Sequence, residues 1–183
     1  MNHTVRWTVA AGAALALLSA CGEDAPGPAA AAASQPAWQG VATDCPRLTA
    51  PAFAGLELDG SGAKTDEPDV LSIRCGYGAA DARPSLVLNL QLNRNPDAHG
   101  QPARHLEGKR KYAELGGHPV IDLPGDAVLL AAPGGAAEAV AASGNAILTA
   151  LAQFDEPLDT EAALVAHQAE LEQSLNDLIA NLR

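Results

Sequence analysis

Apolar and polar residues alternate in two segments near the middle of the chain. In residues 70–77 and again in residues 85–93, every second side chain is apolar. Alternation with a period of two is typical of a strand that buries one face. The short connection between the segments favours an antiparallel pair. The faces expected to be buried carry Leu71, Ile73, Cys75, Tyr77, Leu86, Leu88, Leu90 and Leu92.

Three further strands are predicted more from turn residues than from the strands themselves. These segments are rich in alanine, a poor strand former, but Gly-containing turns separate them. The expected strands are Ala127–Ala132, Ala137–Ala142 and Ala146–Phe154. Asp59–Asp69 is expected to be a loop, and Val120–Leu123 a short extended piece before a Pro-Gly-Asp turn.

A repeat near 3.6 residues predicts two helices in the second half of the chain. The first covers Pro102–Leu115 and stops at a pair of glycines. The second is capped by Asp159 or Thr160 and runs to about Leu182, with its leucines on one stripe. We expect this long C-terminal helix to cover one face of the sheet.

Together these elements predict a single α+β domain, in which an antiparallel sheet of about five strands packs against the long C-terminal helix and the shorter central helix. A short first helix is expected to start at Thr49-Ala50-Pro51, where Thr is a suitable N-cap and Pro fits the first turn. Phe53 and Leu56 would face inward from it.

Residues 1–20 have the organisation of an export signal. Arg6 precedes an apolar run of about thirteen residues, Thr8–Ala20. As a helix this run is about 20 Å long, short of the ~30 Å hydrocarbon core of a bilayer. It ends in Leu18-Ser19-Ala20-Cys21, which resembles the lipobox of bacterial lipoproteins. The resemblance implies cleavage before Cys21 and diacylglycerol on its sulfur; the alternative is an ordinary secretory signal.

Residues 21–44 are expected to be the lipidated Cys and a flexible tether, because low hydrophobicity and repeated proline argue against a packed core. Trp38 is expected to contact the globular domain of residues 45–183, or alternatively the membrane interface. The protein is therefore expected to be exported and lipid-anchored to the cell envelope. In an envelope with two membranes it would face the periplasm from the outer membrane, and otherwise it would lie on the outer face of the plasma membrane.

The net charge restricts the class of partner, and the cysteine content predicts a disulfide. Loss of residues 1–20 removes one basic residue and no acid, which leaves ten basic residues against 22 acidic ones and a formal charge of −12. Such a surface repels nucleic acid and suits a basic protein partner, or serves solubility.

With Cys21 assigned to lipid, Cys45 and Cys75 remain, and outside the cytoplasm such a pair usually forms a disulfide. Two free thiols or half of a metal site are the alternatives.

Several short motifs follow one another along the chain. A Cys opens a short helix in Cys45-Pro46-Arg47-Leu48, a second Cys lies in a strand in Arg74-Cys75-Gly76-Tyr77, and the turn Leu123-Pro124-Gly125-Asp126 precedes further strands. With the lipobox, the tether and the terminal helix, this order resembles an uncharacterised family of bacterial cell-envelope lipoproteins, known as a domain of unknown function. The resemblance covers nearly all of residues 45–183 and implies a fold and a disulfide, not an activity.

A cluster of basic residues on the expected central helix is the strongest charge asymmetry in this acidic chain. It is a candidate site for an anion or an acidic partner. The alternative is a solvated helix face on which Glu107 and Glu114 balance the positive charges at spacings of three or four. The cluster consists of Arg104, His105, Lys109, Arg110 and Lys111.

Patterns for catalysis and metal binding are weak. Neither Gly-x-Ser-x-Gly nor Cys-x-x-Cys occurs in the chain. His99, His105 and His118 are not spaced as zinc ligands, and the acids of residues 66–69 lack the pattern of a calcium loop. We expect no metal and no cofactor.

The function expected from these features is a non-catalytic binding module at the cell envelope, in the role of an assembly accessory, an inhibitor or an immunity protein. Its expected contacts are the membrane, through lipid on Cys21, and a protein partner in the envelope. A carrier or sensor of a small ligand, held between sheet and helix, is the first alternative. A hydrolytic enzyme is the second.

Overall fold

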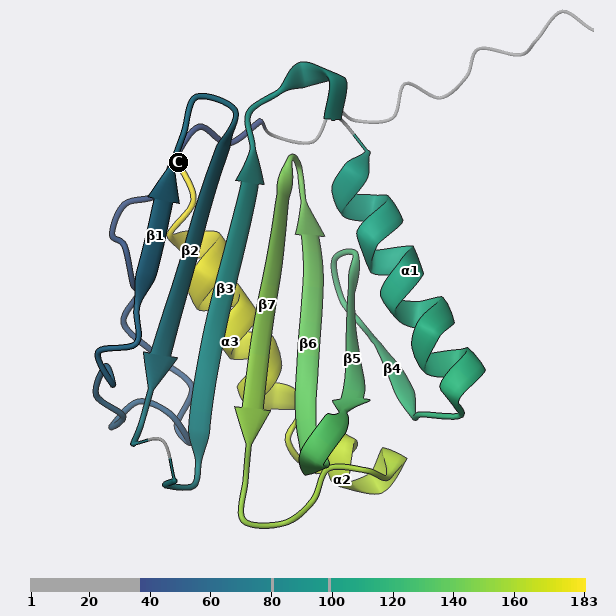
Figure 1. Cartoon of the computed structure of the whole chain (residues 1–183). Coiled ribbons are helices and arrows are strands. Elements are labelled where there is room, and N and C mark those ends of the chain that lie inside the picture. Colours follow the sequence, from purple (N-terminus) through teal and green to yellow (C-terminus); the bar gives the residue numbers. More distant parts are fainter. Residues whose placement is uncertain (1–36, 80, 99) are drawn as a thin grey trace, which may run out of the picture. The chain divides into compact units, whose positions relative to one another are not determined.

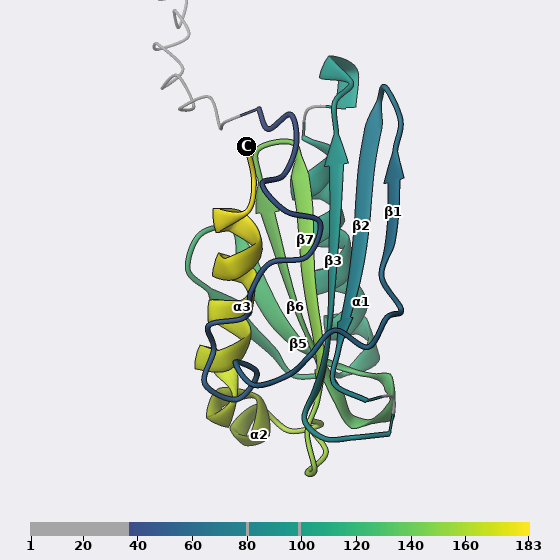
Figure 2. The same cartoon turned by 90° about the vertical axis from the view of Figure 1, so that its left-hand side faces the viewer.

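The computed structural model describes residues 37–79, 81–98 and 100–183. In these residues a seven-stranded antiparallel sheet carries helices on both faces (Figures 1 and 2). The strands are β1 (Ala63–Asp66), β2 (Val70–Tyr77), β3 (Ser85–Asn93), β4 (Val120–Leu123), β5 (Ala127–Ala132), β6 (Ala136–Ser143) and β7 (Ala146–Gln153). The helices are η1 (Pro96–Ala98), α1 (Gln101–Gly116), η2 (Pro133–Gly135), α2 (Glu161–Ala166) and α3 (Gln168–Ala180).

The sheet joins two meanders. Strands β1, β2 and β3 pair in sequence, and so do β4, β5, β6 and β7. The two meanders meet where β3 pairs with β7, with Leu90 opposite Leu148, so the strand order is β1-β2-β3-β7-β6-β5-β4. Helix α1 lies in the long connection between the meanders, and β3 and β7 form the middle of the sheet (Figure 1).

The predicted α+β class and antiparallel sheet are confirmed, but the described sheet has seven strands rather than about five. The sequence predicts β4 only as a short extended piece, and it places β1 inside a loop. All four residues of β1 are exposed, so no alternation of apolar residues marks this strand. Its backbone pairing with β2, from Ala63 opposite Arg74 to Asp66 opposite Leu71, defines it instead.

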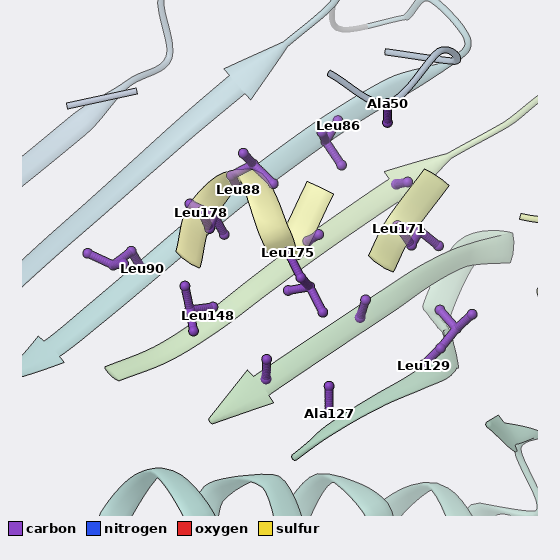
Figure 3. Close-up of a cluster of buried hydrophobic side chains, with 14 of the residues drawn as sticks. Ala50, Leu86, Leu88, Leu90, Ala127, Leu129, Leu148, Leu171, Leu175 and Leu178 are labelled. Carbon is purple, nitrogen blue, oxygen red and sulfur yellow. The ribbon is translucent and has the colours of Figure 1, made fainter. Parts of the chain in front are cut away.

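The main core lies on the face of the sheet that α3 covers, which we call the inner face. There, leucines of β3 and β7 point toward leucines of α3 (Figure 3). Small side chains on β6 and β7, such as the fully buried Ala139 and Ala150, let the helix lie close to the strands. The eight residues predicted to face inward from β2 and β3 are each at most 5% exposed, as the alternation predicts.

The predicted long C-terminal helix is two helices rather than one. The longer of the two, α3, has 13 residues and is shorter than the central helix α1 with 16 residues, so the predicted order of lengths is wrong. Thr160 caps α2 as predicted, since its side chain accepts a hydrogen bond from the Ala163 N–H at 3.2 Å. At His167 the backbone leaves the helical region (φ −114°, ψ 11°), and α3 begins at the next residue. The His167 ring stacks on Phe154 at 3.8 Å between centroids and lies 2.7 Å from a Glu156 oxygen. These tertiary contacts hold His167 in a non-helical conformation at a position where the sequence predicts a continuous helix.

The predicted first helix is wrong, because residues 51–55 form a turn. Phe53 is nevertheless completely buried, as the prediction requires of an inward-facing residue. The Asp177 carboxylate of α3 accepts hydrogen bonds from the Thr49 N–H at 2.8 Å and from the Thr49 hydroxyl at 2.6 Å. A side chain distant in sequence thus binds Thr49, the residue predicted to cap the helix.

The predicted disulfide between Cys45 and Cys75 is confirmed. Because residues 51–55 form a turn, the bond ties an irregular segment, rather than a helix, to strand β2. Cys75 is completely buried in the inner core. The bond therefore fastens the segment before the turn to the part of the sheet that α3 does not cover.

Trp38 contacts the globular domain, as expected. Its backbone N–H donates to Asn145 Oδ1 at 2.8 Å, its indole N–H donates to Ser143 Oγ at 3.2 Å, and its ring packs at the edge of the inner core. Cys21 and the rest of residues 1–36 lie outside the described residues. Among the residues that are described, no helix has the length and apolar character needed to cross a bilayer.

Candidate functional site

The outer face of the sheet, opposite α3, is only partly covered. Helix α1 packs on this face through Leu106 and Ala113, which join a second core with Val128, Leu130 and Val140. Seen along the sheet, α1 and α3 lie on opposite sides (Figure 2). Because α1 sits over β5 and β6, within the described residues no helix covers the outer face of β1, β2 and β3 (Figure 1).

The strand register puts polar side chains in rows across this uncovered part, which we call the open sheet. Ser72 lies opposite Gln91, which lies opposite Ile147. In the next row Arg74 lies opposite Asn89, and Asn89 lies opposite Thr149. Neighbouring strands are about 4.8 Å apart, so each row holds its side chains at a fixed short spacing. The open sheet is defined by Thr65, Ser72, Arg74, Asn89, Gln91, Ile147 and Thr149.

Two hollows flank the place where α1 meets β6. One, of about 230 Å³, lies between α1 and the open sheet, and the other, of about 130 Å³, lies farther along α1. Lys109 and Glu138 line both hollows, so we treat the two as one trough, the α1 trough. The first hollow is also lined by Ser72, Asn89, Leu90, Gln91, His105, Ile147 and Thr149, and the second by Tyr112, Ala113, His118, Leu130, Ala131, Ala132 and Pro133.

An ion pair divides the trough. Lys109 Nζ lies 2.7 Å from Glu138 Oε1 and 2.8 Å from Oε2. The side chains are 32% and 16% exposed, so both charges are partly withdrawn from water. An ammonium has three N–H donors and a carboxylate about four acceptor positions. The pair therefore balances its own charge and still leaves donor and acceptor capacity for a ligand.

His105 stands one helical turn before Lys109 and lines the same hollow. Partial burial lowers the pKa of its imidazole, the Lys109 ammonium lowers that pKa further, and the Glu138 carboxylate partly opposes both effects. At neutral pH the ring is then uncharged and offers one N–H donor and one nitrogen acceptor.

Replacing Lys109 with Gln is expected to raise the pKa of His105. The change removes the cation that disfavours the imidazolium and leaves the attraction of Glu138 unopposed, while burial acts as before. Imidazole NMR signals followed against pH measure the effect, with His105→Gln to assign them. Lys111→Gln is the matched control, because Lys111 lies two residues after Lys109 and therefore on a different face of α1. An unchanged or lowered pKa in Lys109→Gln would show that the ammonium does not act on this ring.

The five residues of the predicted basic cluster do not form one surface. Lys109 turns toward the sheet, and Arg110 pairs with Glu107 at 3.2 Å and with Asp122 at 2.7 Å. Arg104 and Lys111 are exposed on α1, and His105 is only partly covered where it lines the first hollow. Two of the four cations thus have acidic partners, so α1 presents less positive charge to a ligand than the sequence indicates.

The other residues of the trough carry little signal in the sequence. Asn89, Gln91 and Thr149 occupy the polar positions of alternating strands, which usually face solvent. Glu138 carries the clearest sequence signal, because it is the single charged residue in the strand AAEAVAAS. Tyr112 is 74% exposed, and only the packing of α1 shows that it borders a hollow.

Several polar residues outside the trough have structural partners. Arg94 binds Asp66 at 2.8 Å, and in the described part of the chain no group of three or more His, Cys, Asp or Glu residues could hold a metal. His99 lies outside the described residues. Ser61 and Lys64 have the spacing of a Ser-x-x-Lys pair, but Lys64 binds Asp44 at 2.8 Å and the Ser61 N–H donates to Asp59 at 2.7 Å. The lysine is therefore engaged elsewhere.

Comparisons of the chain with known protein families, with curated proteins and with solved structures found no match. Any functional conclusion therefore rests on the surface chemistry of the chain itself.

Proposed function

We propose that this protein is a non-catalytic binding module of the cell envelope, anchored by lipid on Cys21, which recognises an envelope macromolecule with the open sheet and the α1 trough. Its role would be that of an assembly accessory, an inhibitor or an immunity protein. The observation that carries the proposal is the half-covered outer face, where polar side chains stand in register beside a helix that forms one wall of a trough.

The packing beneath the open sheet supports a recognition role. Gln91 alternates with Leu90 and Leu92, which are at most 2% exposed on the inner face, and Thr149 follows the fully buried Leu148. A buried inner face fixes the strand register, because a slip of one residue would expose the leucines. The outer side chains are therefore presented on a rigid surface, which lowers the entropy lost on binding.

The small-ligand alternative requires a cavity between the sheet and α3. That layer is occupied by leucine side chains, with Leu148 and Leu171 fully buried and Leu175 only 2% exposed (Figure 3). Packed leucines favour a structural core at this place. The hollows beside α1 are open to the surface instead, which suits recognition of a larger partner.

The proposal predicts that the partner is lost when the open sheet is blocked. The full chain, solubilised in mild detergent from envelopes, is compared with Gln91→Arg and with the control Asn176→Arg. Gln91 is exposed on the outer face and Asn176 is exposed on α3. An arginine that is buried in the interface without an acidic partner weakens the free energy of binding by several kcal/mol. A component that co-purifies stoichiometrically with the wild type and Asn176→Arg, but not with Gln91→Arg, is expected.

Equal recovery of that component by both variants would place its binding site elsewhere on the protein. Loss with Asn176→Arg alone would point to the α3 side. Far-UV circular dichroism and the midpoint of thermal unfolding of each variant establish that the fold is retained, so that a lost component reports on the surface.

A further inference from the structure

We infer that the α1 trough binds a neutral carbohydrate segment, such as a stretch of an envelope glycan, with its hydroxyl groups on the Lys109–Glu138 pair and a ring face on Tyr112. This inference deepens the proposed function and rests on it, since it names the chemical class of the macromolecule that the outer face recognises.

Charge balance in the trough favours a neutral ligand. Lys109 and Glu138 neutralise each other at 2.7 Å, and both are partly buried. A charged ligand would have to compete with this pair for one member and would leave the other partly buried without its partner, which is costly. A hydroxyl group can accept from the remaining ammonium N–H and donate to the carboxylate at once, so the ion pair stays intact.

The remaining polar side chains of the first hollow also both donate and accept hydrogen bonds. Asn89 and Gln91 carry amides, Ser72 and Thr149 carry hydroxyls, and these four lie on three adjacent strands. Side chains of this kind match the vicinal hydroxyl and ether oxygens of a sugar, which also need both donors and acceptors. The row spacing of about 4.8 Å between strands is comparable to the width of one pyranose ring.

Tyr112 supplies the apolar surface that sugar recognition needs. It is 74% exposed although it lines the second hollow, beside Lys109 and Glu138. An exposed ring that borders a polar trough can cover the C–H face of a sugar, while its hydroxyl remains in water. The exposed aromatic and the polar row thus lie on the two sides of the same ion pair.

The lining of the trough suits binding rather than cleavage of a glycan. Most glycosidases place two carboxyl groups on either side of the scissile bond. Among the residues that line the two hollows, Glu138 supplies the one carboxylate, and it is held by Lys109. This lining therefore favours binding of a glycan over its hydrolysis.

The test is a titration of the full chain, labelled with nitrogen-15 and held in detergent, with two oligosaccharides: a β-1,4-linked tetramer of N-acetylglucosamine and maltotetraose. We expect at least one of them to cause saturable shifts of the Gln91, Thr149 and Tyr112 amide signals. Tyr112→Ala should weaken that binding about tenfold, in line with the loss of roughly 1.4 kcal/mol on removal of an aromatic contact. Leu115→Ala is the matched control, since Leu115 is 79% exposed on the same helix and does not line the trough.

The absence of saturable shifts with either sugar at its solubility limit would overturn the inference, and so would binding that Tyr112→Ala leaves unchanged. A basic peptide of the same length is titrated in parallel. If only the peptide shifts the signals of these residues, the ligand of the trough is a protein and the carbohydrate inference is wrong. The proposed function is tested separately by loss of the co-purifying component with Gln91→Arg, so it can hold when the carbohydrate inference fails.

Discussion

A Cys21→Ser chain is expected to incorporate no labelled fatty acid and to keep residues 1–20, so that its mass exceeds that of the processed wild type. The serine hydroxyl cannot replace the thiolate as the nucleophile that receives diacylglycerol, and cleavage by the lipoprotein peptidase depends on that modification. Each buried methylene of an acyl chain contributes about 0.8 kcal/mol, and two or three chains hold a protein far more firmly than one. The measurement is incorporation of labelled fatty acid in cells, with the mass of the chain as a second readout that reports cleavage before residue 21.

The control for this experiment is the Cys45→Ala/Cys75→Ala chain, which lacks the disulfide and keeps Cys21. It should incorporate fatty acid as the wild type does. Fatty acid incorporation that persists in Cys21→Ser, or a wild-type mature chain that starts at another residue, would contradict the assignment of Cys21 as the lipidated residue. The protein would then be an exported chain without this anchor.

Loss of the disulfide is expected to lower the free energy of unfolding by about 3–4 kcal/mol, from the chain entropy of a closed loop of this length. Cys45 and Cys75 are 30 residues apart in sequence, and the bond fixes the segment that covers the inner face of β2. In the wild type this segment loses less conformational freedom on folding, because the bond already restricts the unfolded chain. Denaturant unfolding of the oxidised wild type and of Cys45→Ala/Cys75→Ala measures the difference.

Wild-type protein reduced by a phosphine is the matched comparison, because it keeps both sulfur atoms and lacks only the bond. It should lose nearly the same stability as the double variant. A difference of less than about 1 kcal/mol between the oxidised and reduced wild type would show that the unfolded chain is not appreciably restricted by the bond.

The parts of the fold that follow from local pattern could be predicted from the sequence. Strands β2 and β3 bury alternate residues, α1 ends at glycines, and Thr160 caps α2, so each element is marked by its own residues. The break at His167 and the turn at residues 51–55 could not be predicted. At both places distant side chains make contacts that the local sequence does not reveal. His167 stacks on Phe154, and Thr49, just before the turn, donates to Asp177.

Less of the candidate site could be predicted, because it forms only when three separate segments pack together. The sequence predicts the charge cluster on α1 as a candidate site, and two of its members, His105 and Lys109, line the trough. Their acidic partner, Glu138, lies 29 residues beyond Lys109 on a strand, and nothing in the sequence pairs the two. The open sheet depends on the length and placement of α1, which covers β5 and β6 and leaves β2 and β3 free.

The most direct measurement is photo-crosslinking in intact cells. A photoreactive amino acid replaces Gln91 on the open sheet or Asn176 on α3, in the otherwise unchanged full chain. We expect a discrete adduct of higher mass from position 91 and none from position 176, and digestion of the adduct by protease or by glycosidase gives its chemical class. An adduct from position 176 with none from position 91 would contradict the claim that the outer face is the recognition surface.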